Sequence, residues 1–194
     1  MPKIRRVTLP DSDIEIDGKV KLLVSGFGQQ TIISVDDVVN AIKILPAKHL
    51  AGLKEISYDP NRLFQSLAYY LNILPNRRSR GEFVQNQRQI NIYAFKTPEK
   101  FHHILYHEIG HYVYFVIIDS ETKKDWVTKI YPRGGFITHY AKRNAAEDFA
   151  ECYSYYVYQP EKLMAVDLKY RFMRDRIFAN NALKRPRASM DLAL

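Results

Sequence analysis

The chain has 194 residues, long enough for one domain with a real hydrophobic core. Its hydrophobic content of 46% and aromatic content of 13% exclude a disordered protein. The net charge of +8 comes from Lys and Arg that are spread along the chain without a nucleic-acid-binding motif, which favours a solvated basic surface over a nucleic-acid partner. Cys152 is the single cysteine, so an intramolecular disulfide and a multi-cysteine zinc site are excluded, and a buried apolar role is expected for it.

The basic start of the chain, Met1 to Arg6, is not followed by an apolar segment, and no apolar run reaches membrane-spanning length. The sequence as given therefore predicts no signal peptide, no membrane partner and a cytoplasmic location. A native signal peptide removed ahead of Met1 would instead make the protein secreted.

In the first half of the chain, alternating apolar residues on both sides of Asp17-Gly18 predict a β-hairpin. Ser34 is a helix N-cap with acidic residues after it, and its helix is expected to reach about Leu45. Further elements are expected in this order: a helical turn from Pro46, a strand over 53–58, a helix over 61–71, a basic loop over 75–81, and two paired strands over 82–85 and 89–95.

The second half is expected to be helical. Thr97-Pro98-Glu99 marks a helix start, with an N-cap, a proline at the first helical position and an acid in the first turn. Apolar residues then recur on almost every side of this helix, which predicts a central position. Later helices are expected over 121–131 with Trp126 in the core, over 144–159 with a capping-box-like pair of Asn144 and Glu147, and over 160–178.

The central helix contains His107-Glu108-Ile109-Gly110-His111, an H-E-x-x-H pattern. Two histidines four residues apart lie on the same helix face, where their imidazoles can hold one Zn²⁺ ion. Glu108 lies beside that pair, where a carboxylate can take a proton from the metal-bound water. Alone, the pattern also fits two structural histidines and a surface glutamate, so a third ligand is needed to support the metal site.

Glu147 and Glu151 supply candidates for the missing ligand, because two carboxylates four residues apart share one helix face. One can complete a site of two histidines and a glutamate, which leaves a fourth zinc position open as catalysis requires. The other can hydrogen-bond a ligand histidine from behind and fix its tautomer. A solvated acidic stripe is the alternative, and the aromatic surroundings argue against it.

His107 to His111, followed by Tyr140 and then by Glu147-Asp148-Phe149-Ala150-Glu151, resembles the catalytic domain of anthrax lethal factor and its small relatives, the Pro-Pro endopeptidases. The shared pattern is H-E-x-G-H and then Y-x6-E-x-F-A-E, and the resemblance covers about residues 90 to 178. Pro-Pro cleavage depends on pocket residues outside these motifs, so the resemblance implies the reaction and not the substrate sequence.

The resemblance implies a role for each matched residue. His107, His111 and Glu147 would be the zinc ligands, Glu108 the general base, and Tyr140 the hydroxyl that stabilises the oxyanion. Glu151 would be the acid that supports a ligand histidine. Two neighbouring histidines are weaker candidates: His139 for the role of Tyr140, and His103 as a residue that packs near the site.

Residues 91–95, which precede the central helix, are a candidate substrate-binding strand. Our hypothesis is that Asn91, Ile92 and Tyr93 hold the substrate by backbone pairing, as an added antiparallel strand. The alternative is an ordinary inner strand whose neighbours are already paired.

These observations predict an α+β, zincin-like metallopeptidase domain of the gluzincin type, with a small sheet packed on an active-site helix. One domain is expected over 1–194, with a sheet-containing half (1–96), a zinc-binding helical half (97–180) and a flexible tail (181–194). The expected function is zinc-dependent hydrolysis of peptide bonds in a restricted set of proteins. Two alternatives are an intracellular regulatory protease that cleaves a repressor-like protein and a non-catalytic binding protein stabilised by zinc. The sequence specifies no oligomeric state.

Overall fold

The computed structural model describes residues 12–16, 20–61, 80–179 and 183. All but the first residue of the expected helix over 61–71, most of the basic loop over 75–81 and almost all of the tail over 181–194 lie outside these residues. Among the described residues, no helix combines the length and the apolar character needed to cross a membrane.

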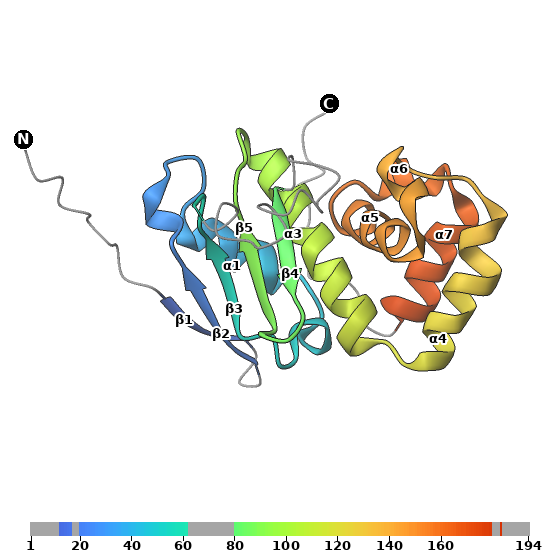
Figure 1. The fold of residues 1–194 in the computed structure, drawn as a ribbon, viewed down its shortest axis with the longest axis horizontal. Coiled ribbons are helices and arrows are strands. Elements are labelled where there is room, and N and C mark those ends of the chain that lie inside the picture. The colour runs from blue at the N-terminus through green and yellow to red at the C-terminus, as the bar shows by residue number, and fades with distance from the viewer. Residues whose placement is uncertain (1–11, 17–19, 62–79, 180–182, 184–194) are drawn as a thin grey trace, which may run out of the picture.

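The fold is α+β, with a mixed sheet in the first half and helices in the second (Figure 1). The strands are β1 (Ser12–Ile16), β2 (Val20–Ser25), β3 (Glu55–Tyr58), β4 (Gly81–Val84) and β5 (Gln89–Ile92). The helices are α1 (Val35–Lys43), α3 (Pro98–Tyr112), α4 (Ser120–Asp125), α5 (Ala145–Tyr158), α6 (Pro160–Met164) and α7 (Asp167–Phe172). Short 3₁₀ turns cover 27–29, 47–50, 131–133 and 140–143, and π-helical turns cover 113–117, 126–130 and 173–177.

The sheet has the strand order β1-β2-β3-β5-β4. β1 and β2 form the expected antiparallel hairpin, and β4 and β5 form the expected antiparallel pair. Between them, β3 pairs in parallel with β2 and with β5, so the sheet is mixed. Parallel pairing requires a crossover, and α1 is part of the connection that leads from β2 to β3.

α1 begins where the sequence predicts. The Ser34 side chain accepts a hydrogen bond from the Asp37 amide, and the Asp37 carboxylate accepts one from the Ser34 amide in return. This reciprocal capping box satisfies two of the amides that a helix start leaves without partners. The expected strand over 53–58 is shorter in the structure, where β3 begins at Glu55.

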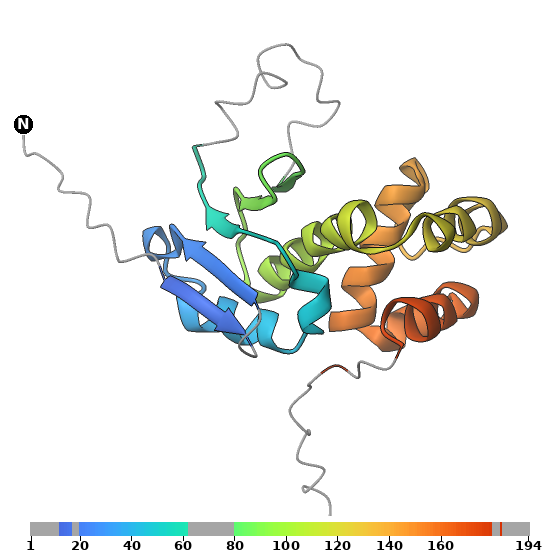
Figure 2. The same ribbon diagram turned by 90° about the horizontal axis from the view of Figure 1, so that it is seen from below.

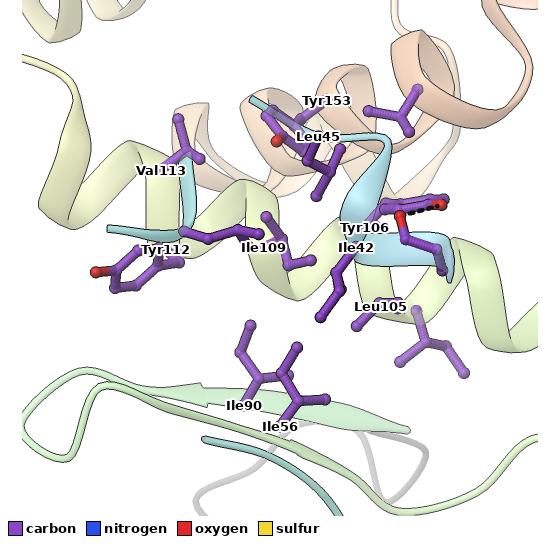
Figure 3. Close-up of a cluster of buried hydrophobic side chains, with 14 of the residues drawn as sticks. Ile42, Leu45, Ile56, Ile90, Leu105, Tyr106, Ile109, Tyr112, Val113 and Tyr153 are labelled. Carbon is purple, nitrogen blue, oxygen red and sulfur yellow. Dashed lines mark hydrogen bonds between the residues drawn. The ribbon is translucent and has the colours of Figure 1, made fainter. Parts of the chain in front are cut away.

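α3 lies between the sheet and the remaining C-terminal helices (Figures 1 and 2). Its apolar face meets the sheet, and Figure 3 shows Leu105 and Ile109 above Ile56 and Ile90 of the inner strands. The buried Tyr106 hydroxyl donates to the Ala41 carbonyl of α1 at 3.0 Å. α3 is therefore central, as the apolar residues on almost all of its sides predict.

The C-terminal helices form a second layer of core against α3. Trp126 is fully buried and its indole N–H donates to the Ala145 carbonyl at 2.8 Å, in agreement with the predicted core position. Cys152 is also fully buried, as expected. The helical region expected over 160–178 is divided in the structure into α6, α7 and a π-helical turn.

Candidate active site

α3 begins with the predicted cap, because the Thr97 side chain accepts a hydrogen bond from the Lys100 amide at 3.3 Å and Pro98 occupies the first turn. From this start the helix continues without interruption to Tyr112, so His107 and His111 stand one turn apart on one face. Both rings are largely buried, and their centroids lie 4.7 Å apart.

α5 begins at a second predicted cap. The Asn144 side chain accepts hydrogen bonds from the amides of Ala146 at 3.0 Å and Glu147 at 2.9 Å. The sequence suggested a capping box, in which the Glu147 carboxylate would also accept from the Asn144 amide. In the structure the Glu147 carboxylate interacts with His107 and His111 instead.

Small residues allow α3 and α5 to pack closely. A Cβ atom added to Gly110 would lie 2.8 Å from the Cα of Ala150 and 3.1 Å from the Cβ of Tyr153. Such contacts are much shorter than the ordinary separation of non-bonded carbon atoms, 3.5–4.0 Å at about its optimum. Gly110 and Ala150, the small residues of the two motifs, therefore permit the close approach that brings the carboxylates of α5 to the histidines of α3.

Three donor atoms converge between these helices. The Nε2 atoms of His107 and His111 are 3.1 Å apart, and Oε2 of Glu147 is 3.2 Å from each of them. Donors that share a tetrahedral zinc ion at roughly 2.0–2.1 Å lie about 3.3 Å from one another. The donor types and the spacing therefore both fit a zinc ion, and among the described residues this group alone has the arrangement of a metal site.

Glu151 holds His107 from the opposite side of its ring. Oε1 of Glu151 lies 2.8 Å from Nδ1 of His107, so Nδ1 carries a proton and Nε2 is the nitrogen left to bind a metal. The same carboxylate oxygen lies 3.3 Å from Nε2 of His103, whose Nδ1 is 3.2 Å from the Ser154 hydroxyl. Nδ1 of His111 is buried and has no hydrogen-bond partner among the described residues.

The charges in this group suit a cation. Burial alone would lower the pKa of His107, but hydrogen bonds to Glu147 and Glu151 outweigh it and raise that pKa to about 10. Burial would raise the pKa of Glu147, but its hydrogen bonds to His107 and His111 lower it to about 2. The pKa of Glu151 is lowered as well, because hydrogen bonds to His103 and His107 outweigh its burial. The carboxylates thus favour positive charge at the centre, which a proton or a metal ion can supply.

Glu108 is buried at the edge of this group, and burial raises the pKa of its carboxyl. Gly81, the first residue of β4, lies close against it: an added Cβ would be 3.0 Å from Oε1 of Glu108 and 2.8 Å from Cγ2 of Ile104. A larger residue at position 81 would displace β4 or the glutamate. The sequence predicts no role for Gly81, and the only local signal for this contact is a glycine directly ahead of an expected strand.

Tyr140 lies on the open side of the group. Its hydroxyl is 3.4 Å from Oε1 of Glu147, its ring lies 5.8 Å from that of His107, and 37% of the residue is exposed. Partial burial, together with the Glu147 charge, raises the pKa of its hydroxyl, so Tyr140 is a proton donor at neutral pH. The Arg143 guanidinium covers the ring at 4.6 Å. His139 is exposed, and Tyr140 begins a 3₁₀ turn.

The hypothesis of a substrate strand on residues 91–95 is not compatible with the sheet. Asn91 pairs with Ser57 of β3 on one side and with Glu82 of β4 on the other, and Ile92 is likewise paired on both sides. The Tyr93 amide donates to the Arg80 carbonyl at 2.8 Å, and its side chain is buried. The alternative of an inner strand therefore describes β5, and among the described residues β4 is the outer strand on this side of the sheet.

A family model matches residues 73–188, more than half of the chain, and is described as "putative zinc-binding metallo-peptidase". The chain belongs to this family. The match includes β4, β5, α3 and α5, which together hold the three donor atoms and Glu108. A search of curated proteins found no match, and a search of solved structures found none either. Family membership supports a zinc-dependent peptidase with a protein or peptide substrate, and it does not extend to lethal factor in particular.

Proposed function

We propose that this protein is a zinc-dependent endopeptidase of zincin-like, gluzincin-type architecture, acting on a restricted set of proteins. The observation that carries the proposal is the convergence of His107, His111 and Glu147 at 3.1–3.2 Å beside the buried Glu108. His107, His111 and Glu147 would hold the zinc, which when bound polarises the scissile carbonyl and lowers the pKa of water to near neutrality.

Glu108 acts as the general base. It takes a proton from the attacking water and later passes that proton to the leaving amine. Its buried position supports this role, because burial raises its pKa, and a carboxylate with a raised pKa takes a proton from water more readily than an exposed one. Gly81 allows β4 to pack against Glu108 and so limits where its carboxyl can lie.

The Tyr140 hydroxyl donates a hydrogen bond to the oxyanion that develops as the carbonyl is attacked. Its exposure supports this role, because the side chain can turn from Glu147 toward a bound peptide. The spacing of seven residues from Tyr140 to Glu147 supports a relationship to the lethal-factor relatives within the broader family.

The substrate lies along β4 in this proposal, in place of the excluded pairing with β5. β4 is the outer strand of the described sheet on this side, and it lies against α3 beside Glu108. An extended peptide can add to an outer strand by main-chain hydrogen bonds.

The test is zinc content together with cleavage of a mixed peptide library by the wild type, Glu108→Gln and Glu161→Gln. Glu161 is an exposed residue of α6 and serves as the matched control. We expect equimolar zinc in all three proteins, and cleavage by the wild type and Glu161→Gln alone. Full activity of Glu108→Gln would contradict the role of Glu108 as general base.

Bound zinc without cleavage of any peptide would favour the non-catalytic binding protein. The donor set supports the enzyme instead, since structural zinc is normally closed by four protein ligands and the described residues bring three together. The cut sites would also distinguish a Pro-flanked bond, as in the Pro-Pro endopeptidases, from the target of a regulatory protease that cleaves repressors.

A further inference from the structure

Two exposed aromatic residues lie beside the donor group, one against each histidine. The ring of Tyr140 lies next to His107, and the ring of Phe115 stacks on His111 with centroids 6.1 Å apart and 23° between the planes. Phe115 is 41% exposed, although the residues before it, Val113 and Tyr114, are buried. Tyr140 has a proposed role in the reaction, and Phe115 has none so far.

The position of Phe115 follows from the helix. Phe115 is four residues after His111, as His111 is four after His107, so the three side chains share one face. After α3 the chain continues through a π-helical turn, in which the Ile118 amide donates to the Val113 carbonyl at 3.0 Å. This backbone is regular and hydrogen-bonded, so it fixes the point at which the Phe115 side chain leaves the helix. An apolar ring held open to water gains free energy when another apolar group covers it.

We propose that Phe115 forms the apolar wall of a substrate subsite and selects a large apolar side chain in the peptide. The proposal rests on the proposed peptidase function and deepens it, because it names a residue that determines specificity. The contact between Phe115 and His111 makes this wall continuous with the metal-ligating face of α3.

The direction of β4 indicates which substrate residue meets Phe115. Gly81 faces Ile104 and Glu108, and the Phe83 ring lies 5.4 Å from that of Tyr112, so β4 runs in the same direction as α3. A peptide that adds antiparallel to β4 therefore runs from the Phe115 end of the helix toward Ile104. The selected side chain then lies on the N-terminal side of the scissile bond.

The first measurement is the cleavage profile of a degenerate peptide library for the wild type, Phe115→Ala, Phe115→Leu and Val127→Ala. Val127 is a matched control, because it is 40% exposed and apolar but lies in the π-helical turn after α4. We expect the wild type to prefer a large apolar residue at one position N-terminal to the cut. Phe115→Ala should lose about tenfold or more of that preference, while Phe115→Leu and Val127→Ala should keep most of it.

The second measurement needs no turnover. Two pools of fluorescent degenerate peptides, one containing Leu and Phe and the other Asp and Ser in their place, are titrated into zinc-loaded Glu108→Gln with and without Phe115→Ala. We expect the apolar pool to bind more tightly, and Phe115→Ala to remove that difference while zinc content stays the same.

Two results would overturn the subsite. One is an unchanged difference between the pools in Phe115→Ala, and the other is a lost preference that lies C-terminal to the cut. A wild type that cleaves no peptide would reject the peptidase function separately, and the binding measurement would still decide whether Phe115 selects apolar residues.

Discussion

His107 and His49 are both buried histidines that touch α5, yet their surroundings drive their pKa values in opposite directions. His107 lies between Glu147 and Glu151, and these carboxylates raise its pKa to about 10 in spite of burial. His49 lies in an apolar setting, where burial lowers its pKa to about 4. Its Nδ1 accepts from the Tyr153 hydroxyl at 2.9 Å, and its Nε2 donates to the Ile177 carbonyl at 3.1 Å.

The difference shows that neighbours, and not burial, decide what a histidine can do. Both rings have their nitrogens in contact with polar atoms, but His49 is satisfied as a neutral group by a hydroxyl and a carbonyl. Both nitrogens of His107 contact carboxylates, which favour a positive charge at Nε2, the nitrogen that faces Glu147. His49 is therefore a packing residue, and His107 belongs to a cation site. Four variants test this comparison.

The largest expected effect is a loss of stability in acid caused by His49. Its pKa is about 4 in the folded protein and 6.5 as a free group, so the unfolded chain binds more protons between these values. The contribution of His49 to the free energy of unfolding is fully present above pH 6.5. It is lost as the pH drops toward 4, by roughly 3 kcal/mol in total. His49→Gln can keep both hydrogen bonds without titrating, so urea unfolding at pH 7 and pH 4.5 should show a flatter dependence than the wild type. Lys43→Gln, at an exposed position, is the control and should keep the wild-type dependence on pH. A dependence in His49→Gln as steep as that of the wild type would contradict this prediction.

Gly110→Ala is expected to disturb both histidines, because α5 carries partners of each of them. Alanine favours a helix over glycine by about 1 kcal/mol, but the new Cβ would lie 2.8 Å from the Ala150 backbone. Since a backbone atom cannot move aside without shifting the helix, overpacking should win and cost about 1–3 kcal/mol. Urea unfolding measures the loss, with Lys100→Ala, an exposed position of the same helix, as the control. A more stable Gly110→Ala would show that the helices are not in close contact.

Glu151→Gln removes one of the two charges that distinguish His107 from His49. The amide oxygen can still accept from Nδ1, but without the charge the ring is a weaker metal ligand. Zinc affinity, measured by competition with a chelator, should fall about 10–100-fold, while Glu161→Gln leaves it unchanged. Unchanged affinity in Glu151→Gln would mean that the carboxylate does not act through His107.

The neighbours of His107 could be predicted from the sequence much better than those of His49. His107, Glu108 and His111 lie within one helix, so helical periodicity groups their side chains. Glu147 lies on α5, and the resemblance of its motif to a known family identified it as the third ligand. His49 meets Tyr153 and Ile177, which are 104 and 128 residues away, and no local pattern carries such a contact. The sheet shows the same limit: alternation predicted the antiparallel pairs β1–β2 and β4–β5, but not the parallel pairing that places β5 inside and excludes the substrate strand on Asn91 and Ile92.

The smallest expected effect is that of His103→Gln, which tests how far the polar surroundings of His107 extend. Nε2 of His103 is 3.3 Å from Oε1 of Glu151, so His103 can influence the metal through Glu151 and not directly. Its side chain is 34% exposed, and solvent screens such a contact. We therefore expect zinc affinity to fall less than tenfold, and by less than in Glu151→Gln. His102→Gln, at the neighbouring position and stacked on Tyr158, should have no effect. If His103→Gln and Glu151→Gln lowered zinc affinity equally, the two residues would act as one unit, and the feature that separates His107 from His49 would be a histidine–carboxylate pair rather than a single charge.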